Sequence, residues 1–149
     1  MTIVAVSGGF DPVHVGHIDL FADALKYGDK LIVILNNDEF LLRKKGFVFM
    51  PLEERKKILE SIRYVDEVVV SIDKDQTVRE TLRLIHPDIF VKSANRKGHS
   101  EADVCNEIGC QRIYIGEKVQ SSSKLVERVI QLACEKCQYK GTKEYSLQR

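Results

Sequence analysis

The sequence lacks a dominant charge, a long apolar run and any internal repeat. Its 23 lysine and arginine residues balance 22 aspartate and glutamate residues, so a broad nucleic-acid or membrane surface is not indicated. No apolar run approaches the roughly 20 residues that span a bilayer, and the chain opens directly on a strand pattern. Low-complexity tracts and domain linkers are also missing. We therefore expect a cytoplasmic protein with neither nucleic-acid nor membrane partners.

Cysteine is scarce as well, with four residues at Cys105, Cys110, Cys134 and Cys137. The last two form a C-x-x-C pair, which the first two would complete in a zinc site. Against zinc, Cys134 falls in an apolar helical pattern, and the spacing of Cys105 and Cys110 exceeds that of a usual zinc knuckle. The sequence therefore predicts reduced, partly buried thiols and no structural metal, with zinc as the alternative.

Short apolar runs rich in β-branched residues alternate with amphipathic helical patterns along the chain. Because such alternation is typical of parallel sheets with right-handed crossovers, it predicts an α/β fold. The length of 149 residues suits one domain, which we place at residues 1–137, followed by a loosely ordered polar tail at 138–149. The predicted strands are residues 3–6, 30–35, 65–70, 88–92 and 111–115. One predicted helix covers residues 77–85, with Thr77 or Asp75 as its cap.

The turn between the first strand and the first helix carries the residues best suited to chemistry. It reads Ser7-Gly8-Gly9-Phe10-Asp11-Pro12-Val13-His14-Val15-Gly16-His17. Glycines allow close approach of the backbone to phosphate, and a helix N-terminus attracts it. Two histidines three positions apart project the same way and can donate hydrogen bonds to oxygens that gain charge. The alternative is an ordinary strand–helix turn with two incidental histidines.

The segment His14-Val15-Gly16-His17 resembles the His-x-Gly-His signature of the nucleotidylyltransferase superfamily, and Gly9-Phe10-Asp11-Pro12 resembles its lead-in. The resemblance implies a Rossmann-like, doubly wound sheet of five parallel strands in the order 3-2-1-4-5. It further implies transfer of a nucleoside monophosphate from an NTP to a small phosphorylated acceptor, with release of pyrophosphate. The residues expected to take part are His14 and His17 as catalytic groups, and Gly8, Gly9, Phe10, Asp11 and Gly16 as nucleotide contacts.

Two further expectations come with this resemblance. Mg²⁺ is expected to bridge the phosphate oxygens, because it dehydrates reluctantly, and Asp11 is the nearest acid that could assist it. A homodimer is expected because relatives are often dimers.

A basic segment, Arg43-Lys44-Lys45-Gly46, follows the second strand and is predicted to be a loop. It is either a solvated basic turn or a mobile cationic loop that closes over a triphosphate. The superfamily carries a lysine here, which favours Lys44 as a catalytic residue and Lys45 as second choice. Asp38, at the end of the same strand, is expected to contact the substrate.

The stretch Glu54–Val68 is similar to the corresponding part of glycerol-3-phosphate cytidylyltransferases. The similarity implies an active-site role for Arg63 and makes CTP with glycerol 3-phosphate the preferred substrate pair. Arg55 matches a family arginine as well. It is either a substrate contact or an exposed helical arginine paired with neighbouring glutamates.

Two later segments bear on the substrates. Residues 93–99 depart from the Gly-Gly-Asp-Arg turn of relatives, although Arg96 keeps a cation and is expected to bind substrate. Ser121, Ser122 and Ser123 precede an apolar helix; capping explains at least one of them, and the superfamily uses such serines to hold the departing phosphates. Residues 117–120 lack the arginine of cytidylyltransferases. These departures leave two alternatives: an ATP-dependent enzyme of the heptose-phosphate adenylyltransferase type, and a nucleotide-binding regulator without turnover.

Overall fold

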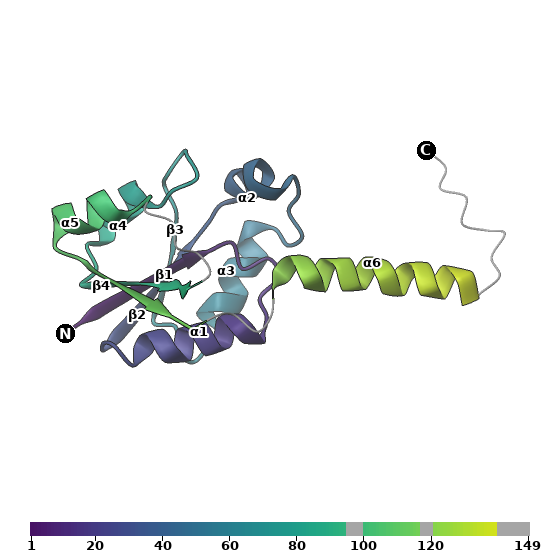
Figure 1. The fold of residues 1–149 in the computed structure, drawn as a ribbon, viewed down its shortest axis with the longest axis horizontal. Coiled ribbons are helices and arrows are strands. Elements are labelled where there is room, and N and C mark those ends of the chain that lie inside the picture. The colour runs from purple at the N-terminus through teal and green to yellow at the C-terminus, as the bar shows by residue number, and fades with distance from the viewer. Residues whose placement is uncertain (95–99, 117–120, 140–149) are drawn as a thin grey trace.

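A computed structural model describes residues 1–94, 100–116 and 121–139, in which strands and helices alternate (Figure 1). In chain order the elements are β1 (Ile3–Gly8), α1 (Val15–Leu25), β2 (Lys30–Leu35), α2 (Asp38–Lys45), α3 (Leu52–Glu60), β3 (Glu67–Val70), α4 (Arg79–Ile85), β4 (Ile89–Ser93), α5 (Ala102–Ile108), β5 (Gln111–Ile115) and α6 (Ser122–Tyr139).

All five strands belong to one parallel sheet with the order β3-β2-β1-β4-β5, which confirms the predicted fold class and strand order. β1 lies in the centre and pairs with β2 from Ile3 opposite Lys30 to Gly8 opposite Leu35. The chain order reverses between β1 and β4. In open α/β sheets, ligands bind beyond the carboxyl ends of the strands at such a switch point.

The sheet is buried on both faces, which explains why its strands read as continuous apolar runs. Successive side chains of a strand point to opposite faces. Val4 and Val6 of β1 accordingly join the core under α1, where Phe21 is fully buried. Ala5, between them, joins a second core with Leu82 of α4 and Val104 of α5. Helices therefore pack on both faces of the sheet, and this packing fixes them relative to the carboxyl ends of the strands.

The basic segment is not a loop but the end of helix α2, which corrects the sequence prediction. Asn37 caps the start of this helix, since its Oδ1 accepts a hydrogen bond from the amide of Phe40 at 2.8 Å. Gly46 ends it in the left-handed conformation, with φ of 82°. Cations in the last turn suit the negative end of the helix dipole, so the basic residues favour the helix instead of breaking it.

Helix α6 differs from the other helices because it projects away from the sheet (Figure 1). It continues to Tyr139, so the predicted tail boundary at residue 138 falls inside the helix. The remainder of that tail, residues 140–149, lies outside the described residues. No helix in the described ranges combines the length and apolar character needed to cross a bilayer.

The cysteines lie in two separate places. Cys105 and Cys110 are buried beside α5, whereas Cys134 and Cys137 are exposed on α6. A hydrogen bond with Cys105, together with burial, raises the pKa of the Cys110 thiol. The prediction that all four thiols are partly buried was wrong for the α6 pair, because none of the described residues covers that part of the helix. Within the described ranges, no three His, Cys, Asp or Glu side chains gather as a metal site would require.

Arg55 of α3 is fully buried and joins the ends of three chain segments. Its Nε donates to the carbonyl oxygen of Met50 at 2.8 Å. Its Nη1 donates to the carbonyl oxygens of Gly9, at 2.7 Å, and Asn36, at 2.8 Å. Its Nη2 donates to the Asp38 carboxylate at 2.6 Å. Neither sequence expectation agrees with this position, because the guanidinium is neither exposed nor accessible to a substrate. Its role is to position the strand ends.

Replacing Arg55 with methionine tests that role. Three carbonyl oxygens would lose their donors, and we expect the free energy of unfolding to fall by about 3–5 kcal/mol. Lys57→Met, an exposed change on the same helix, should alter it by less than about 0.5 kcal/mol. Urea denaturation of the two variants measures both values. Equal stability of the variants would contradict a structural role for Arg55.

Candidate active site

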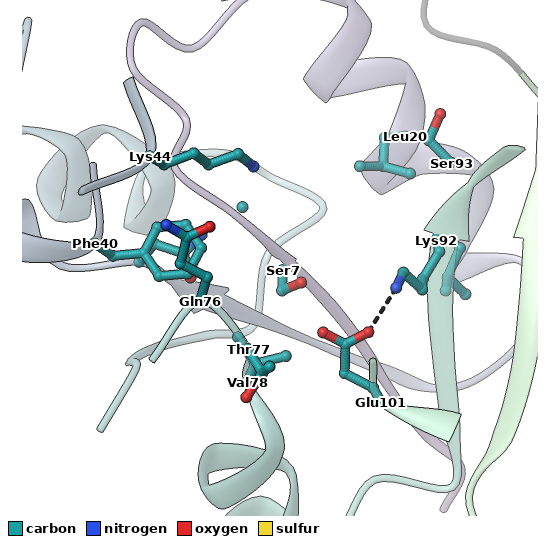
Figure 2. Close-up of a pocket in the computed structure, with 13 residues that line it drawn as sticks. Ser7, Leu20, Phe40, Lys44, Gln76, Thr77, Val78, Lys92, Ser93 and Glu101 are labelled. Atoms are coloured by element: carbon teal, nitrogen blue, oxygen red, sulfur yellow. Dashed lines mark hydrogen bonds and ion pairs between the residues drawn. The ribbon is translucent and has the colours of Figure 1, made fainter. Parts of the chain in front are cut away.

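A cavity of about 140 Å³ lies at the carboxyl ends of β1, β2 and β4 (Figure 2). Ser7 of β1 stands in its middle. Lys44 and Gln76 approach from one side, and Lys92 with Glu101 from the other. The cavity therefore sits at the topological switch point, where the fold predicts ligand binding.

The two signature histidines meet at the start of α1. His14 is the N-cap residue, and His17 lies in the first turn. Their rings stack with centroids 3.7 Å apart and planes 22° apart. The backbone amide of His14 donates to Nδ1 of His17 at 3.2 Å. Because Nδ1 accepts this hydrogen bond, the proton of a neutral His17 ring resides on Nε2, which makes Nε2 a donor. The structure thus brings both histidines together in one buried pair.

Phe10 supports this pair from behind. It is 2% exposed and adopts a positive φ of 49°. Its ring packs edge-on against His17, with centroids 4.8 Å apart, and also contacts Phe21. A Cβ at Gly8 would lie 3.0 Å from the Phe10 ring, and one at Gly9 would lie 2.6 Å from Leu41. The two glycines therefore make room for this packing. Phe10, expected as a nucleotide contact, positions the His17 ring.

Two helix N-termini converge on the same turn. Gly16 is buried in the first turn of α1. Ser122, at the start of α6, donates from Oγ to the carbonyl oxygen of Pro12 at 2.9 Å. Oγ of Ser121 accepts the amide of Lys124 at 3.1 Å and so caps α6. Both helices direct backbone N–H groups toward this region, which favours an anion. Ser121 and Ser122 are thus brought to the site edge, and Ser123 is exposed beside them.

Asp11 is 1% exposed, and its carboxylate is occupied by the chain itself. It accepts the amides of Phe49 at 2.7 Å and Met50 at 2.6 Å, and forms an ion pair with Lys45 at 3.3 Å. The carboxylate therefore tethers the segment that joins α2 to α3. Both carboxylate oxygens of Asp11 are bound within the chain, so the side chain is badly placed to assist a metal ion or to contact a nucleotide.

The neighbouring lysines have different positions. Lys45 is held by Asp11, whereas the Lys44 side chain lines the cavity with its Nζ 5.6 Å from the Phe40 ring centroid (Figure 2). Asp38 lies at the start of α2 with its side chain 42% exposed and bound to Arg55. Of the two lysines, Lys44, the first choice from the sequence, is the one that lines the cavity.

Arg63 lies at the wrong edge of the sheet for the role expected of it. It follows α3 and precedes β3, and parallel strands all begin at the edge opposite the cavity. Nearby, Asp66 accepts the amide of Leu31 at 2.8 Å, near the start of β2. Arg63 itself is exposed and donates to the hydroxyl of Tyr64 at 2.6 Å. The chain therefore does not bring Arg63 into its own cavity.

Sequence reasoning assigned no role to several polar residues that line the cavity, among them Lys92, Glu101 and Asn36. Lys92 and Glu101 form an ion pair at 2.6 Å, with side chains only 13% and 9% exposed. Asn36 is 4% exposed, and its Oδ1 has no hydrogen-bond partner among the described residues. These residues carry no local motif. The one available signal is their position at or after strand ends, where polar groups face the ligand edge.

Residues 76–78 form the rim of the cavity, and the Asp73 carboxylate, which the sequence did not indicate, fixes the start of the helix that follows them. Asp73 binds most of the free amides at the start of α4, and Thr77, one of the two predicted caps, accepts the amide of Arg79 at 3.5 Å. Asp73 accepts the amides of Glu80 at 2.8 Å and Thr81 at 3.1 Å, and the Thr81 hydroxyl at 2.5 Å. Asp75 instead binds the amide of Thr77 within the preceding turn. Arg96, which was expected to bind substrate, and residues 117–120, which lack the arginine of cytidylyltransferases, lie outside the described residues.

Comparison with known proteins agrees with this geometry. A family model described as cytidylyltransferase-like matches residues 5–131. An FAD synthase of Pyrococcus abyssi is 31% identical over 146 residues, covering 89% of this chain and 95% of that protein. Glycerol-3-phosphate cytidylyltransferase of Bacillus subtilis is 39% identical over 98 residues, covering 66% and 75%. The bifunctional protein HldE of Gluconacetobacter diazotrophicus is 35% identical over 128 residues, covering 83% of this chain and 26% of that protein.

A solved structure has the same fold. The lipopolysaccharide core biosynthesis protein of Thermoplasma volcanium aligns with a TM-score of 0.67 and 22% identity, covering 81% of this chain and 99% of that one. With the family model spanning most of the chain and the stacked histidines at the head of α1, the chain belongs to the cytidylyltransferase-like family and is a nucleotidyltransferase.

Proposed function

We propose that this protein transfers a nucleoside monophosphate from an NTP to a small, hydroxyl-rich phosphate and releases pyrophosphate. The observation that carries the proposal is the stacked pair of His14 and His17 at a helix N-terminus, in the turn that follows the cavity-lining residues Ser7 and Gly8. The pair supplies ring N–H donors, and the helix supplies backbone N–H groups. Together they favour the negative charge of a triphosphate.

In this proposal an oxygen of the acceptor phosphate attacks the α-phosphorus in line. The new P–O bond forms as the bond to the bridging oxygen of the leaving pyrophosphate breaks. The acceptor is already an anion, so no protein nucleophile or strong base is required. Catalysis then consists of positioning and charge stabilisation. His14 and His17 would donate to phosphate oxygens, Lys44 would hold the triphosphate, and the serines at the start of α6 would hold the pyrophosphate.

Mg²⁺ is proposed to enter with the NTP and to lower the charge of its phosphates. The described residues do not form a cage for the ion, because Asp11 is occupied by two amides and Lys45. The phosphate oxygens and water would hold it instead, as is usual for this ion.

The cavity lining supports a hydroxylated acceptor. Asn36 lines the cavity, and its buried Oδ1 has no hydrogen-bond partner within the described part of the chain; such a group costs about 1–3 kcal/mol until a ligand satisfies it. Glu101 presents carboxylate oxygens, and Ser7 and Thr77 line the same space. Hydrogen-bond-accepting oxygens of this kind suit the hydroxyl groups of a polyol or a sugar, while the cation of Lys44 suits the phosphate.

The nucleotide has two candidates. CTP, with glycerol 3-phosphate, is the pair indicated by the sequence of residues 54–68. That stretch forms α3 and the start of β3, however, and its Arg55 and Arg63 do not reach the cavity. ATP is favoured by the relatives named FAD synthase, which match 89% of the chain. For ATP the cavity supports a sugar phosphate as acceptor. A regulator without turnover would still bind an NTP but release no pyrophosphate.

Pyrophosphate release tests the proposal directly. The protein is incubated with each of the four NTPs and Mg²⁺ against glycerol 3-phosphate, several sugar phosphates, an aminoalcohol phosphate and FMN. We expect turnover with CTP or ATP and a hydroxylated phosphate, and none after addition of EDTA. Turnover with FMN alone would contradict a small acceptor, because FMN carries hydroxyls on its ribityl chain but adds a three-ring flavin. NTP binding without turnover on any acceptor would favour the regulator.

His17→Gln separates the chemistry of the ring from its role in the fold. Glutamine at this position can still accept the amide at the helix start but lacks the ring N–H donor. We expect kcat to fall about 100-fold or more, with an unfolding free energy within about 1.5 kcal/mol of the wild type. His86→Asn, at the left-handed end of α4, serves as the control and should keep full activity. An active His17→Gln variant would exclude His17 from catalysis.

The two adjacent lysines provide a matched pair. Lys44→Met removes the cation that lines the cavity, so we expect kcat/KM to fall about 10- to 100-fold with stability unchanged. Lys45→Met removes the partner of the buried Asp11, so stability should fall by about 1–3 kcal/mol while kcat/KM changes less. Steady-state kinetics and urea denaturation of both variants measure the two effects. A larger loss of kcat/KM in Lys45→Met than in Lys44→Met would assign the triphosphate contact to Lys45.

A further inference from the structure

Two cysteines that take no part in the proposed chemistry lie together where α5 ends. Cys105 belongs to α5, and Cys110 lies just beyond Gly109, which ends the helix in the left-handed conformation with φ of 69°. The amide of Cys110 donates to the carbonyl oxygen of Cys105 at 2.8 Å, and the amide of Gly109 donates to that of Asn106 at 3.4 Å. These two bonds define a Schellman motif, in which the side chains at the positions of Cys105 and Cys110 meet.

Both cysteine side chains are buried, and neither is bonded to another sulfur. Cys105 is fully buried and Cys110 is 6% exposed, in the core that also holds Leu82 and Val104. A hydrogen bond joins the two thiols, so their sulfur atoms are in contact. A backbone hydrogen bond between two residues also keeps their Cα atoms within the roughly 4.4–6.8 Å that a disulfide spans. The fold therefore holds two thiols where a bond between them requires little movement.

The hydrogen bond between the thiols gives them different roles. Because the Cys110 thiol donates to Cys105, the pKa of Cys105 is lowered, and the cation of Arg112 adds to this effect. The same contact, together with burial, raises the pKa of Cys110. The thiolate is the form that attacks an oxidant, and a neutral thiol beside it can resolve the product. Cys105 is thus suited to react first and Cys110 second.

We propose that Cys105 and Cys110 form a reversible oxidation site, which hydrogen peroxide converts into a disulfide within the folded protein. The Cys105 sulfur attacks one peroxide oxygen, the O–O bond breaks, and the other oxygen leaves with the thiol proton as water. The Cys110 sulfur then attacks the resulting sulfenic acid. The S–S bond forms as the S–O bond breaks, and the second thiol proton leaves with that oxygen as water. Two thiols are oxidised, and one peroxide is reduced to two waters.

The oxidant is assigned from burial, and the effect of the bond from its place in the fold. Hydrogen peroxide is small and uncharged, whereas a bulky disulfide reagent has little access to thiols that are at most 6% exposed. The amide of Cys105 donates to the carbonyl oxygen of Glu101 at 3.0 Å, and the amide of Gln111 donates to that of Asp88 at 2.8 Å. A disulfide here ties α5 to the start of β5, so it should stabilise this part of the sheet edge.

Peroxide treatment of the folded, full-length chain tests the site. The background carries Cys134→Ser and Cys137→Ser, because these exposed thiols would react as well. After treatment, remaining thiols are alkylated in denaturant, and trypsin releases residues 98–112 as one peptide that holds both core cysteines. We expect this peptide to lack two hydrogen atoms and to carry no alkyl group until dithiothreitol is added. The melting temperature should rise by about 4–8 °C on oxidation and return on reduction.

Cys110→Ala in the same background is the matched control. It keeps Cys105 but removes the resolving thiol, so peroxide should leave a sulfenic or sulfinic acid and no gain in melting temperature. Two alkylated cysteines after peroxide treatment would overturn the proposal, and so would sulfinic acids without an S–S bond. A disulfide that appears only as the native circular dichroism signal is lost would overturn it too, because the pair must react within the fold. These outcomes are independent of nucleotidyl transfer, which the pyrophosphate assay tests separately.

Discussion

The architecture of the site depends on one buried cation. The guanidinium of Arg55 donates to the carbonyl oxygens of Gly9, Asn36 and Met50 and to the carboxylate of Asp38. Removing a guanidinium from water is costly unless its donors are satisfied, and here they bind groups that would otherwise be orphaned. The ends of β1 and β2 and the approach to α3 are thereby held at fixed separations. Asp11 extends the same framework by binding the amides of Phe49 and Met50.

This framework concentrates positive electrostatic potential at the site, although the protein as a whole is not basic. The net charge is only +1, so attraction of a triphosphate must be local. Two helix N-termini, Lys44 and the histidine pair lie around one turn, and dipoles held by a rigid backbone need no reorganisation when an anion arrives. The opposite wall has a different character. There Glu101 is paired with Lys92. The two walls of the cavity thus differ, since one holds Lys44 and the other a carboxylate that is bound to a lysine (Figure 2).

Much of the fold follows from local sequence, and the chemistry of the site follows in part. The strands are readable because a sheet buried on both faces selects continuous apolar runs, and their alternation with helices implies parallel pairing. His14 and His17 are readable because their spacing and glycines form a local motif. The buried positions of Arg55 and Asp11 cannot be predicted in this way, because burial of a charge depends on partners remote in sequence. Arg63 is instructive in another way. A residue that precedes a parallel strand lies at the edge away from the site, so topology alone argues against a role in its own cavity.

The bond between Ser122 and Pro12 joins residues 110 positions apart. The turn that bears the histidines is made first during translation, and the helix that completes its surroundings is made near the end. Before residue 122 is synthesised, only α1 can direct backbone N–H groups at this turn. The second helix N-terminus is added last, so the surroundings of the histidines depend on a segment remote from them in sequence.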